Sequence, residues 1–284
     1  MTFEQIRAKY LKSHEEYNLR PETAWIDPFR VFGPIYYVGD KKVCVHLVDT
    51  GDGLLLIDAG FPHTVHMLTE SIYRLGFDPK DIRMILHTHG HFDHFGASES
   101  FRRLYGCSLA LSRTDAEWLE KEPGIGLTAM CDVVSPLCRV PSFDRLIEDG
   151  ENITMGNITV ECLPIPGHTP GAMAFFMDVS DGERTLRAGL FGGAGKGSLS
   201  VAELTMFNEP MSLRDDMLRS LDIMAEKHVD VMLGNHPANN DTLGRRERQL
   251  AGEKDAFVDP KAWPAFLKKT RSEFEKYYLE DPSV

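Results

Sequence analysis

The segment 87–94 of the sequence, HTHGHFDH, holds four histidines and one aspartate within eight residues. Burying several imidazoles and a carboxylate together is costly unless a partner compensates them, and a divalent metal ion is such a partner. Imidazole and carboxylate ligands without thiolate favour zinc or a similar first-row metal. The H-x-H-x-D-H spacing is too tight for a helix, where metal ligands repeat at i and i+4. We therefore expect a metal-binding loop; the alternative is a histidine-rich surface loop that binds no metal.

The spacing within this loop predicts two metal ions. His89 and His91 fall on one side of the chain by alternation, so we expect them to bind the first metal. Asp93 and His94 then turn toward a second metal.

Two distant histidines are placed to complete these ligand sets. His168 lies in the turn Pro166–Gly171, where two prolines and two glycines form a tight and rigid backbone. It is the expected third histidine of the first metal. His236 follows an apolar strand expected at 229–233, and the end of a buried strand is also where the loop 87–94 begins.

Strands and helices of ordinary length surround these ligands. The strand 82–86 runs directly into the histidine loop, and a helix at 97–105 follows it. Further strands are expected at 35–38, 43–48, 54–57, 109–111, 145–148, 157–163, 172–177, 185–191 and 229–233, and further helices at 3–11, 64–75, 114–120, 212–228 and around Trp263–Phe274. Because no long polar linker divides the chain, we expect one domain over residues 1–284. It would carry an N-terminal helical extension at 1–25 and C-terminal helices within 244–284.

Several residues near the expected site have two interpretations. Asp58, after the strand 54–57, is either a turn former or a group that orients a metal-bound histidine. His87 alternates with His89 and His91 and so could be a ligand itself, but with six ligands assigned we expect it to support a ligand in this way or to belong to the strand. Asn239 either contacts substrate or shapes a turn. The aperiodic apolar segment 123–141 is either a cover over a cleft or an ordinary packed connection.

Composition narrows the possible partners. The 284 residues carry a formal net charge of -12, which argues against a general nucleic-acid-binding surface. The five cysteines are scattered and form no C-x-x-C pair, which is typical of a reducing compartment. No apolar run resembles a secretory signal or a membrane-spanning helix. We therefore expect a cytoplasmic protein that acts on a small molecule and binds neither nucleic acid nor membrane; the sequence does not indicate its oligomeric state.

Together these motifs resemble those of a known family. Beside the histidine loop they are Asp27–Phe32 with Tyr36–Gly39, Leu56–Gly60, Pro166–Gly171 and His236–Pro237. On these segments the chain resembles the metallo-β-lactamase superfamily over nearly its whole length, and within it the subclass B3 metallo-β-lactamases. The resemblance implies an α/β fold of the αββα type, a sandwich of two mixed β-sheets flanked by helices, with the metals at one edge between the sheets.

The resemblance also implies the complete metal site. One zinc would bind His89, His91 and His168, and a second zinc would bind Asp93, His94 and His236. Asp93 and His236 are also the expected catalytic residues.

One departure from the wider superfamily concerns the segment 189–195, GLFGGAG. Many superfamily hydrolases bridge the two metals with an aspartate here, whereas this chain has no carboxylate and Gly193 occupies the position. Subclass B3 enzymes also lack the bridge. The serines that bind a substrate carboxylate in those enzymes are not obvious either, and Lys196 and Ser198 are the possible substitutes.

The expected activity follows from the metals. Zinc lowers the pKa of bound water to about 7, so that hydroxide is available at neutral pH to attack a carbonyl carbon. We expect a dinuclear zinc hydrolase that opens a cyclic amide of the β-lactam type or a related small ester or amide. The alternatives are a lactone or thioester hydrolase on the same fold, and an iron-dependent oxidoreductase.

Overall fold

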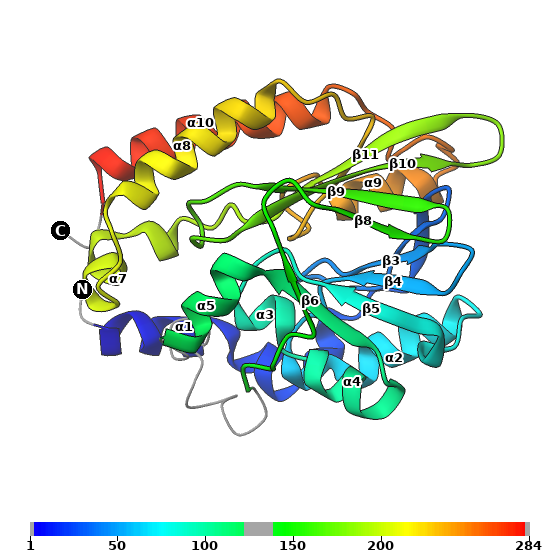
Figure 1. The fold of residues 1–284 in the computed structure, drawn as a ribbon, viewed down its shortest axis with the longest axis horizontal. Coiled ribbons are helices and arrows are strands. Elements are labelled where there is room, and N and C mark those ends of the chain that lie inside the picture. The colour runs from blue at the N-terminus through cyan, green and yellow to red at the C-terminus, as the bar shows by residue number, and fades with distance from the viewer. Residues whose placement is uncertain (1–2, 122–138, 282–284) are drawn as a thin grey trace.

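The computed structural model describes residues 3–121 and 139–281 of the chain. The expected cover segment 123–141 lies almost wholly outside the described residues. Within them, two β-sheets lie face to face and helices cover both outer faces (Figure 1).

The first sheet has seven strands, which lie side by side in the order of the sequence. Strands β1 to β4 are antiparallel to their neighbours, and β4 to β7 run parallel. The strands are β1 (Phe29–Phe32), β2 (Ile35–Tyr37), β3 (His46–Asp49), β4 (Leu54–Ile57), β5 (Ile82–Leu86), β6 (Ser108–Ser112) and β7 (Arg145–Ile147). The parallel pairing Ile57↔Leu86 brings the ends of β4 and β5 to the same edge, so that the residues after both strands meet there.

The second sheet has five strands in the order β12-β11-β10-β9-β8. They are β8 (Asn152–Met155), β9 (Ile158–Pro164), β10 (Met173–Ser180), β11 (Thr185–Phe191) and β12 (Val231–Leu233). Only β11 and β12 are parallel, with Leu190 opposite Leu233. The segments that follow these two strands therefore leave the sheet at the same edge.

Helices on the outside complete four layers. The helices are α1 (Phe3–Leu19), α2 (Val65–Arg74), α3 (Phe92–Phe95), α4 (Ser98–Tyr105), α5 (Arg113–Lys121), α7 (Val201–Met206), α8 (Ser212–Ala225), α9 (Thr242–Leu250) and α10 (Ala262–Leu279). Helices α2 and α4 pack on the outer face of the first sheet, with Ile72 and Phe101 against Leu56. Helices α8 and α10 pack on the second sheet, with Met217 and Trp263 in one cluster with Phe176.

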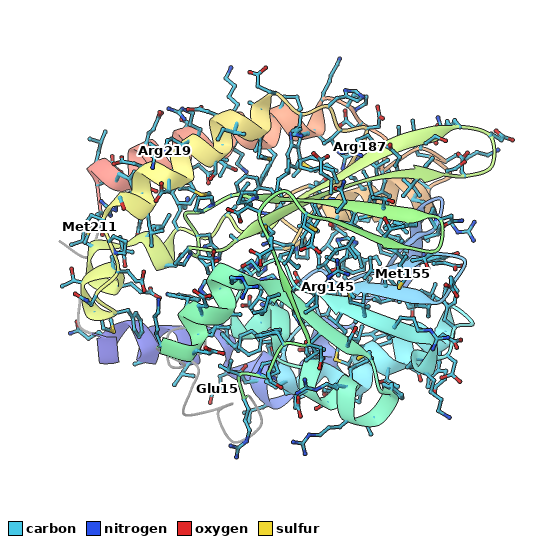
Figure 2. The ribbon with its side chains drawn as sticks, viewed as in Figure 1. Glu15, Arg145, Met155, Arg187, Met211 and Arg219 are labelled. Carbon is cyan, nitrogen blue, oxygen red and sulfur yellow. The ribbon has the colours of Figure 1, made fainter. Side chains whose placement is uncertain are left out.

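The core between the sheets is apolar. Ile57 and Leu86 of the first sheet share one buried cluster with Phe175 and Leu190 of the second. Side chains fill the space between the layers (Figure 2). Burial of this apolar surface stabilises the sandwich at about 25 cal/mol per Å² removed from water. The expected αββα fold is confirmed.

Most expected elements are present, with shifted ends. The strands at 54–57, 82–86 and 185–191 have the expected bounds, whereas the helix expected at 3–11 continues to Leu19. The expectation of a single strand at 157–163 missed β8, which forms a hairpin with β9 around Gly156 in the left-handed region (φ +54°). The strand β1 and the short helices α3 and α7 were also missed as elements. Helix α10 and most of α9 fall in the region 244–284, where C-terminal helices were expected.

Among the helices that the structure describes, none is both long enough and apolar enough to cross a bilayer. Cys44, Cys107 and Cys162 are buried free thiols. The cellular location and the single-domain extent stay predictions.

Candidate metal centre

Two groups of three metal-binding side chains lie at the shared edge of the two sheets. His89, His91 and His168 form the first group, which we call the imidazole triad. Asp93, His94 and His236 form the second, the carboxylate triad. Within each triad the candidate ligand atoms all lie within 4.8 Å of one another. All six residues expected as metal ligands are thus brought together, in the two sets that the resemblance implied.

Four chain segments carry these six side chains. The loop after β5 carries His89 and His91, and the single-turn helix α3 carries Asp93 and His94. The turn between β9 and β10 carries His168, and the turn after β12 carries His236. The loop after β5, which continues into α3, and the turns after β9 and β12 lie at the same edge, so the backbone of the sandwich fixes the spacing of the donors.

The imidazole triad has the spacing of a tetrahedral metal site. His91 Nδ1 lies 3.1 Å from both His89 Nε2 and His168 Nε2. Neighbouring donors around zinc lie about 3.3 Å apart when the Zn–N bonds are about 2.0–2.1 Å. The three nitrogen atoms therefore fit a single metal ion.

The carboxylate triad contains an unsatisfied buried atom. His94 Nε2 is buried and has no hydrogen-bond partner among the described residues. It lies 3.5 Å from Asp93 Oδ2, and His236 Nε2 lies 3.6 Å from the same oxygen. A buried polar atom without a partner costs free energy, and a cation between these donors would remove that cost. The residues fit a second metal ion.

The opposite ring nitrogens of four histidines are held by acceptors. His94 Nδ1 donates to Asp58 Oδ2 (2.7 Å), His236 Nδ1 to the Lys42 carbonyl (2.8 Å) and His168 Nδ1 to the Gly195 carbonyl (2.9 Å). His89 Nδ1 lies 3.0 Å from Thr88 Oγ1, which itself donates to Asp58. Each of these bonds leaves Nε2 as the lone-pair nitrogen that faces the triad, as metal-binding histidines require.

The two triads have opposite electrostatic characters. Burial lowers the pKa of His91 to about 4 and holds the pKa values of His89 and His168 well below the usual range, with neighbouring imidazoles adding to the effect. Burial opposes the charged form of His94 too, but Asp93 and Asp58 outweigh it and raise its pKa. The pKa of Asp93 is lowered, because His94 and His236 outweigh its burial.

At neutral pH the imidazole triad is therefore neutral, which is the form that binds metals. The carboxylate triad contains one ionised carboxylate beside a histidine that readily accepts a proton.

Asp58 orients the carboxylate triad. Its side chain is buried, accepts from the backbone N–H (2.8 Å) and the hydroxyl of Thr88, and accepts from His94 as described above. Asp58 itself lies in the left-handed region, at φ +60°. Of the two interpretations, the structure favours the group that orients a histidine, although Asp58 also shapes the turn after β4.

Asp115 is a buried carboxylate that the sequence did not single out. Its oxygens accept from the backbone N–H of Gly90 (2.7 Å), the backbone N–H of Gly171 (2.6 Å) and the hydroxyl of Thr169 (2.7 Å). Gly90 lies between two expected ligands, and Thr169 follows His168. Asp115 therefore ties the two loops of the imidazole triad together. Burial raises its pKa to about 6.

Gly193 explains the missing bridge between the metals. A Cβ atom on this residue would lie 2.4 Å from Cδ2 of His168, inside any tolerated contact. A carboxylate side chain at this position would displace the His168 ring. The structure thus agrees with the absence of a bridging aspartate from the sequence.

The remaining expected site residues lie as follows. His87 is buried and bonds to the Ala110 carbonyl and Ser98 Oγ, which favours its strand role, because neither ring nitrogen bonds to a triad member. Asn239 Oδ1 accepts from the backbone N–H of His236 (2.9 Å), which favours its turn role. Ser198 Oγ lies 3.0 Å from His168 Nδ1 and borders the site. Lys196 turns away from the site and pairs with Glu273 of α10 (3.1 Å).

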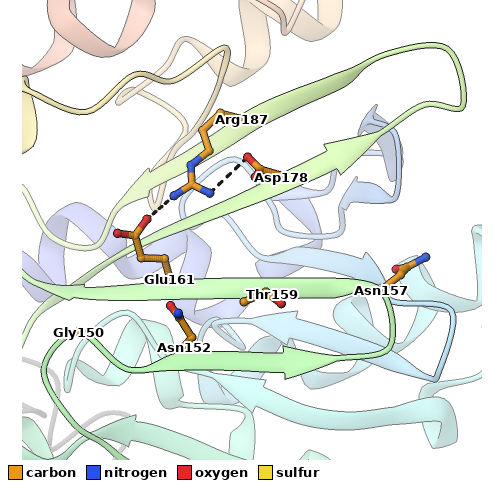
Figure 3. A pocket seen from close by; sticks show the side chains of 7 residues that line it. All are labelled: Gly150, Asn152, Asn157, Thr159, Glu161, Asp178 and Arg187. Atoms are coloured by element: carbon orange, nitrogen blue, oxygen red, sulfur yellow. Dashed lines mark hydrogen bonds and ion pairs between the residues drawn. The ribbon is translucent and has the colours of Figure 1, made fainter.

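A hollow of about 460 Å³ lies on the outer face of the second sheet, and no triad residue lines it (Figure 3). The charged residues that line it pair with one another, because Arg187 contacts Glu161 and Asp178. Lys227, which does not line it, also contacts Glu161. The hollow offers no cluster of metal-binding side chains among the described residues. The triads, and not this hollow, are the candidate centre of chemistry.

The model of the metallo-β-lactamase superfamily matches residues 38–236, a span that contains all six ligands. The chain belongs to this superfamily. Two relatives are a probable metallo-hydrolase, YqgX, of Bacillus subtilis (28% identity over 146 residues, 51% of this chain and 64% of that protein) and a hydroxyacylglutathione hydrolase of Rhodospirillum rubrum (28% over 95 residues, 34% and 29%). These alignments span less than two thirds of either relative.

A solved structure of the superfamily shares the fold over almost its whole length. The subclass B3 metallo-β-lactamase BJP-1 of Bradyrhizobium japonicum has 26% identity and a TM-score of 0.82, and the match covers 93% of this chain and 98% of that chain. The resemblance to the superfamily and to its B3 members is confirmed.

Proposed function

We propose that this chain is a dinuclear zinc hydrolase that opens a cyclic amide of the β-lactam type or a related small ester or amide. The observation that carries the proposal is the pair of triads, six donor atoms in two groups at one edge of the sandwich. Membership of a metallo-hydrolase superfamily supports it. The near-complete match to a B3 metallo-β-lactamase supports the amide as the scissile group.

The imidazole triad would hold one zinc ion and the carboxylate triad the other. When bound, zinc supplies an activated water at neutral pH and polarises a carbonyl group. The low pKa values of His89, His91 and His168 keep three lone pairs available for this purpose.

Asp93 has a role beyond ligation. Its carboxylate is ionised and lies between His94 and His236, so it can accept a hydrogen bond from a water molecule and orient that water at the reacting centre. His94 and His236 are in turn fixed by Asp58 and the Lys42 carbonyl, so the acceptor oxygen has a defined position. These contacts support Asp93 and His236 as the catalytic pair.

A thioester or lactone is the second candidate substrate class. A relative of this chain is named a hydroxyacylglutathione hydrolase, although only 34% of this chain aligns with it. The geometry of the triads suits any carbonyl carbon that reaches them.

A substrate screen on zinc-loaded protein tests the proposal. A chromogenic cephalosporin would be set beside a lactone, a thioester and a phosphodiester, each with and without a chelator. We expect at least one carbonyl substrate to be hydrolysed, with activity lost on chelation and restored by zinc, and metal analysis near two ions per chain. Activity that persists without metal, or bound iron with oxygen uptake, would contradict the proposal.

A further inference from the structure

A narrow cavity opens beside the imidazole triad, between α5, α7 and the start of α8. Its lining residues come from the triad itself, the turn after His168, the helices α5, α7 and α8, and the segments on either side of α7. Its volume is about 20 Å³, enough for one water-sized polar group and not for a bulky one. Because His91 and His168 form part of its wall, the cavity borders the imidazole triad.

Two carboxylates line this cavity. Glu209 Oε1 accepts from the indole N–H of Trp118 (2.8 Å), which also lines the cavity. Glu203 has no hydrogen bond or ion pair to its side chain among the described residues, although its backbone N–H bonds to Ser200 at the start of α7. Burial raises the pKa of the Glu203 carboxyl, and no favourable contact offsets that burial. A carboxylate in this position lacks a positive partner.

Two cations that flank the cavity residues in the sequence, Lys196 and Arg214, are directed elsewhere. None of the described residues that line the cavity is a lysine or an arginine. Lys196 pairs with Glu273, and Arg214 pairs with Asp281 and donates to the Leu199 carbonyl. Lys42, beside the carboxylate triad, is exposed and lies over the ring of Tyr17. The cavity is therefore a negatively charged recess at the imidazole end of the site.

Resting on the proposed function, we propose that Glu203 and Glu209 are specificity-determining residues that select a substrate whose acyl chain carries an ammonium group. An ammonium group in the cavity gains charge-assisted hydrogen bonds to both carboxylates. A substrate carboxylate placed there would meet like charge on Glu203 and Glu209, with no lysine or arginine among the described residues of the lining, so that only a zinc ion bound to the triad would offset the repulsion. Typical β-lactams with a free carboxylate on that side would accordingly be poor substrates.

Three esters of equal acyl length test the selection. They are 4-nitrophenyl 6-aminohexanoate (cationic), 4-nitrophenyl hexanoate (neutral) and mono-4-nitrophenyl adipate (anionic), assayed on zinc-loaded protein with the uncatalysed rate subtracted. We expect kcat/KM to fall in that order, with the cationic ester at least about tenfold above the anionic one. The double variant Glu203→Gln/Glu209→Gln should reduce this ratio to near unity while it still hydrolyses the neutral ester.

The control variant is Asp215→Asn. It removes the same kind of charge from an exposed residue of α8, two positions after Leu213 of the cavity wall, and should leave the ratio unchanged. Equal rates for the three esters, or a preference for the anionic ester, would overturn the inference while the hydrolase assignment stands.

A binding measurement separates the inference from the proposed function. Trp118 lies in the cavity wall, so its fluorescence reports occupancy without turnover. We expect n-hexylammonium to change the emission at lower concentration than n-hexanol, and Glu203→Gln and Trp118→Phe each to abolish that difference. If no ester is hydrolysed with zinc bound, the proposed function fails for esters, and the fluorescence titration alone decides the charge preference of the cavity. Equal binding of n-hexylammonium and n-hexanol would overturn that preference.

Discussion

The two triads differ in how the fold supports them. The carboxylate triad is supported through a side chain, because Asp58 bonds directly to the ring of His94. The imidazole triad is supported through the backbone, because Asp115 bonds to the N–H groups of Gly90 and Gly171 and to no triad ring. Both aspartates are buried, but Asp58 sets the charge and tautomer of a ligand, whereas Asp115 sets the distance between two loops.

A neutral and a charged metal site therefore need different supports from the fold. The imidazoles of the first triad are neutral because burial and their neighbours disfavour protonation, so they need position and no countercharge. The second triad balances one carboxylate against two histidines, so its ring orientation matters as much as its position.

Removal of one ligand from each triad should have the largest effect. We expect His89→Ala and Asp93→Ala each to reduce kcat/KM by more than the roughly 10–100-fold typical of losing a group that merely orients a ligand. Each should also lower the metal content by about one ion per chain, measured by elemental analysis after dialysis. Two variants with full metal content and full activity would show that the triads are not the centre of chemistry. Asp215→Asn is the matched control.

Substitutions of the two supporting aspartates should affect the two triads differently. Asp115→Ala leaves two buried N–H groups without acceptors, at about 1–3 kcal/mol each, so the free energy of unfolding should fall by roughly 2–6 kcal/mol. Asp58→Asn presents an amide N–H to His94 Nδ1 and favours the wrong tautomer, so it should lower the affinity for the second metal about 10–100-fold with a smaller loss of stability.

Urea unfolding of the metal-free variants and zinc titration measure the two effects. The comparison of the supports is contradicted if Asp58→Asn weakens both metals equally, or if Asp115→Ala is as stable as the unaltered chain.

The sequence predicted the centre better than its supports. The ligands could be predicted because histidines that follow apolar strands can meet where those strands end, at one sheet edge. The bounds of β4 and β5 were predicted correctly from the same apolar pattern. Asp115 could not be found this way. An acidic residue in the first turn of a helix is typical of helices in general. The backbone groups that Asp115 binds lie 25 and 56 positions away in the sequence.

The charge of the cavity beside the imidazole triad could not be predicted from the sequence for a similar reason. Lys196 follows the glycine-rich segment closely enough to be taken for a substrate contact, yet its ammonium bonds to Glu273, which is distant in sequence. Glu203 and Glu209 lie in and after α7, a short helix without a clear periodic pattern, and nothing in their spacing indicates a cavity.

The smallest predicted effect is the pH dependence of the metal-free protein. His91 has an ordinary pKa of about 6.5 when unfolded and about 4 when folded, so between these values the unfolded chain binds the extra proton. Its contribution to stability is therefore complete above about pH 6.5 and is lost as the pH falls toward 4, which amounts to about 2 kcal/mol between pH 7 and pH 5. His94 has a raised pKa and the opposite sign: its contribution is complete at low pH and is lost as the pH rises through its folded pKa.

Urea unfolding of chelator-treated protein at pH 7 and pH 5 would separate these signs. Relative to the unaltered chain, His91→Gln should lose less stability on acidification and His94→Gln should lose more. If both variants shifted the pH dependence of stability in the same direction, the two triads would be electrostatically alike and not one neutral and one charged. The two glutamines remove the same imidazole from positions three residues apart. Asp93 raises the pKa of both histidines, whereas Asp58 acts on His94 and not on His91, so the difference in sign comes chiefly from Asp58.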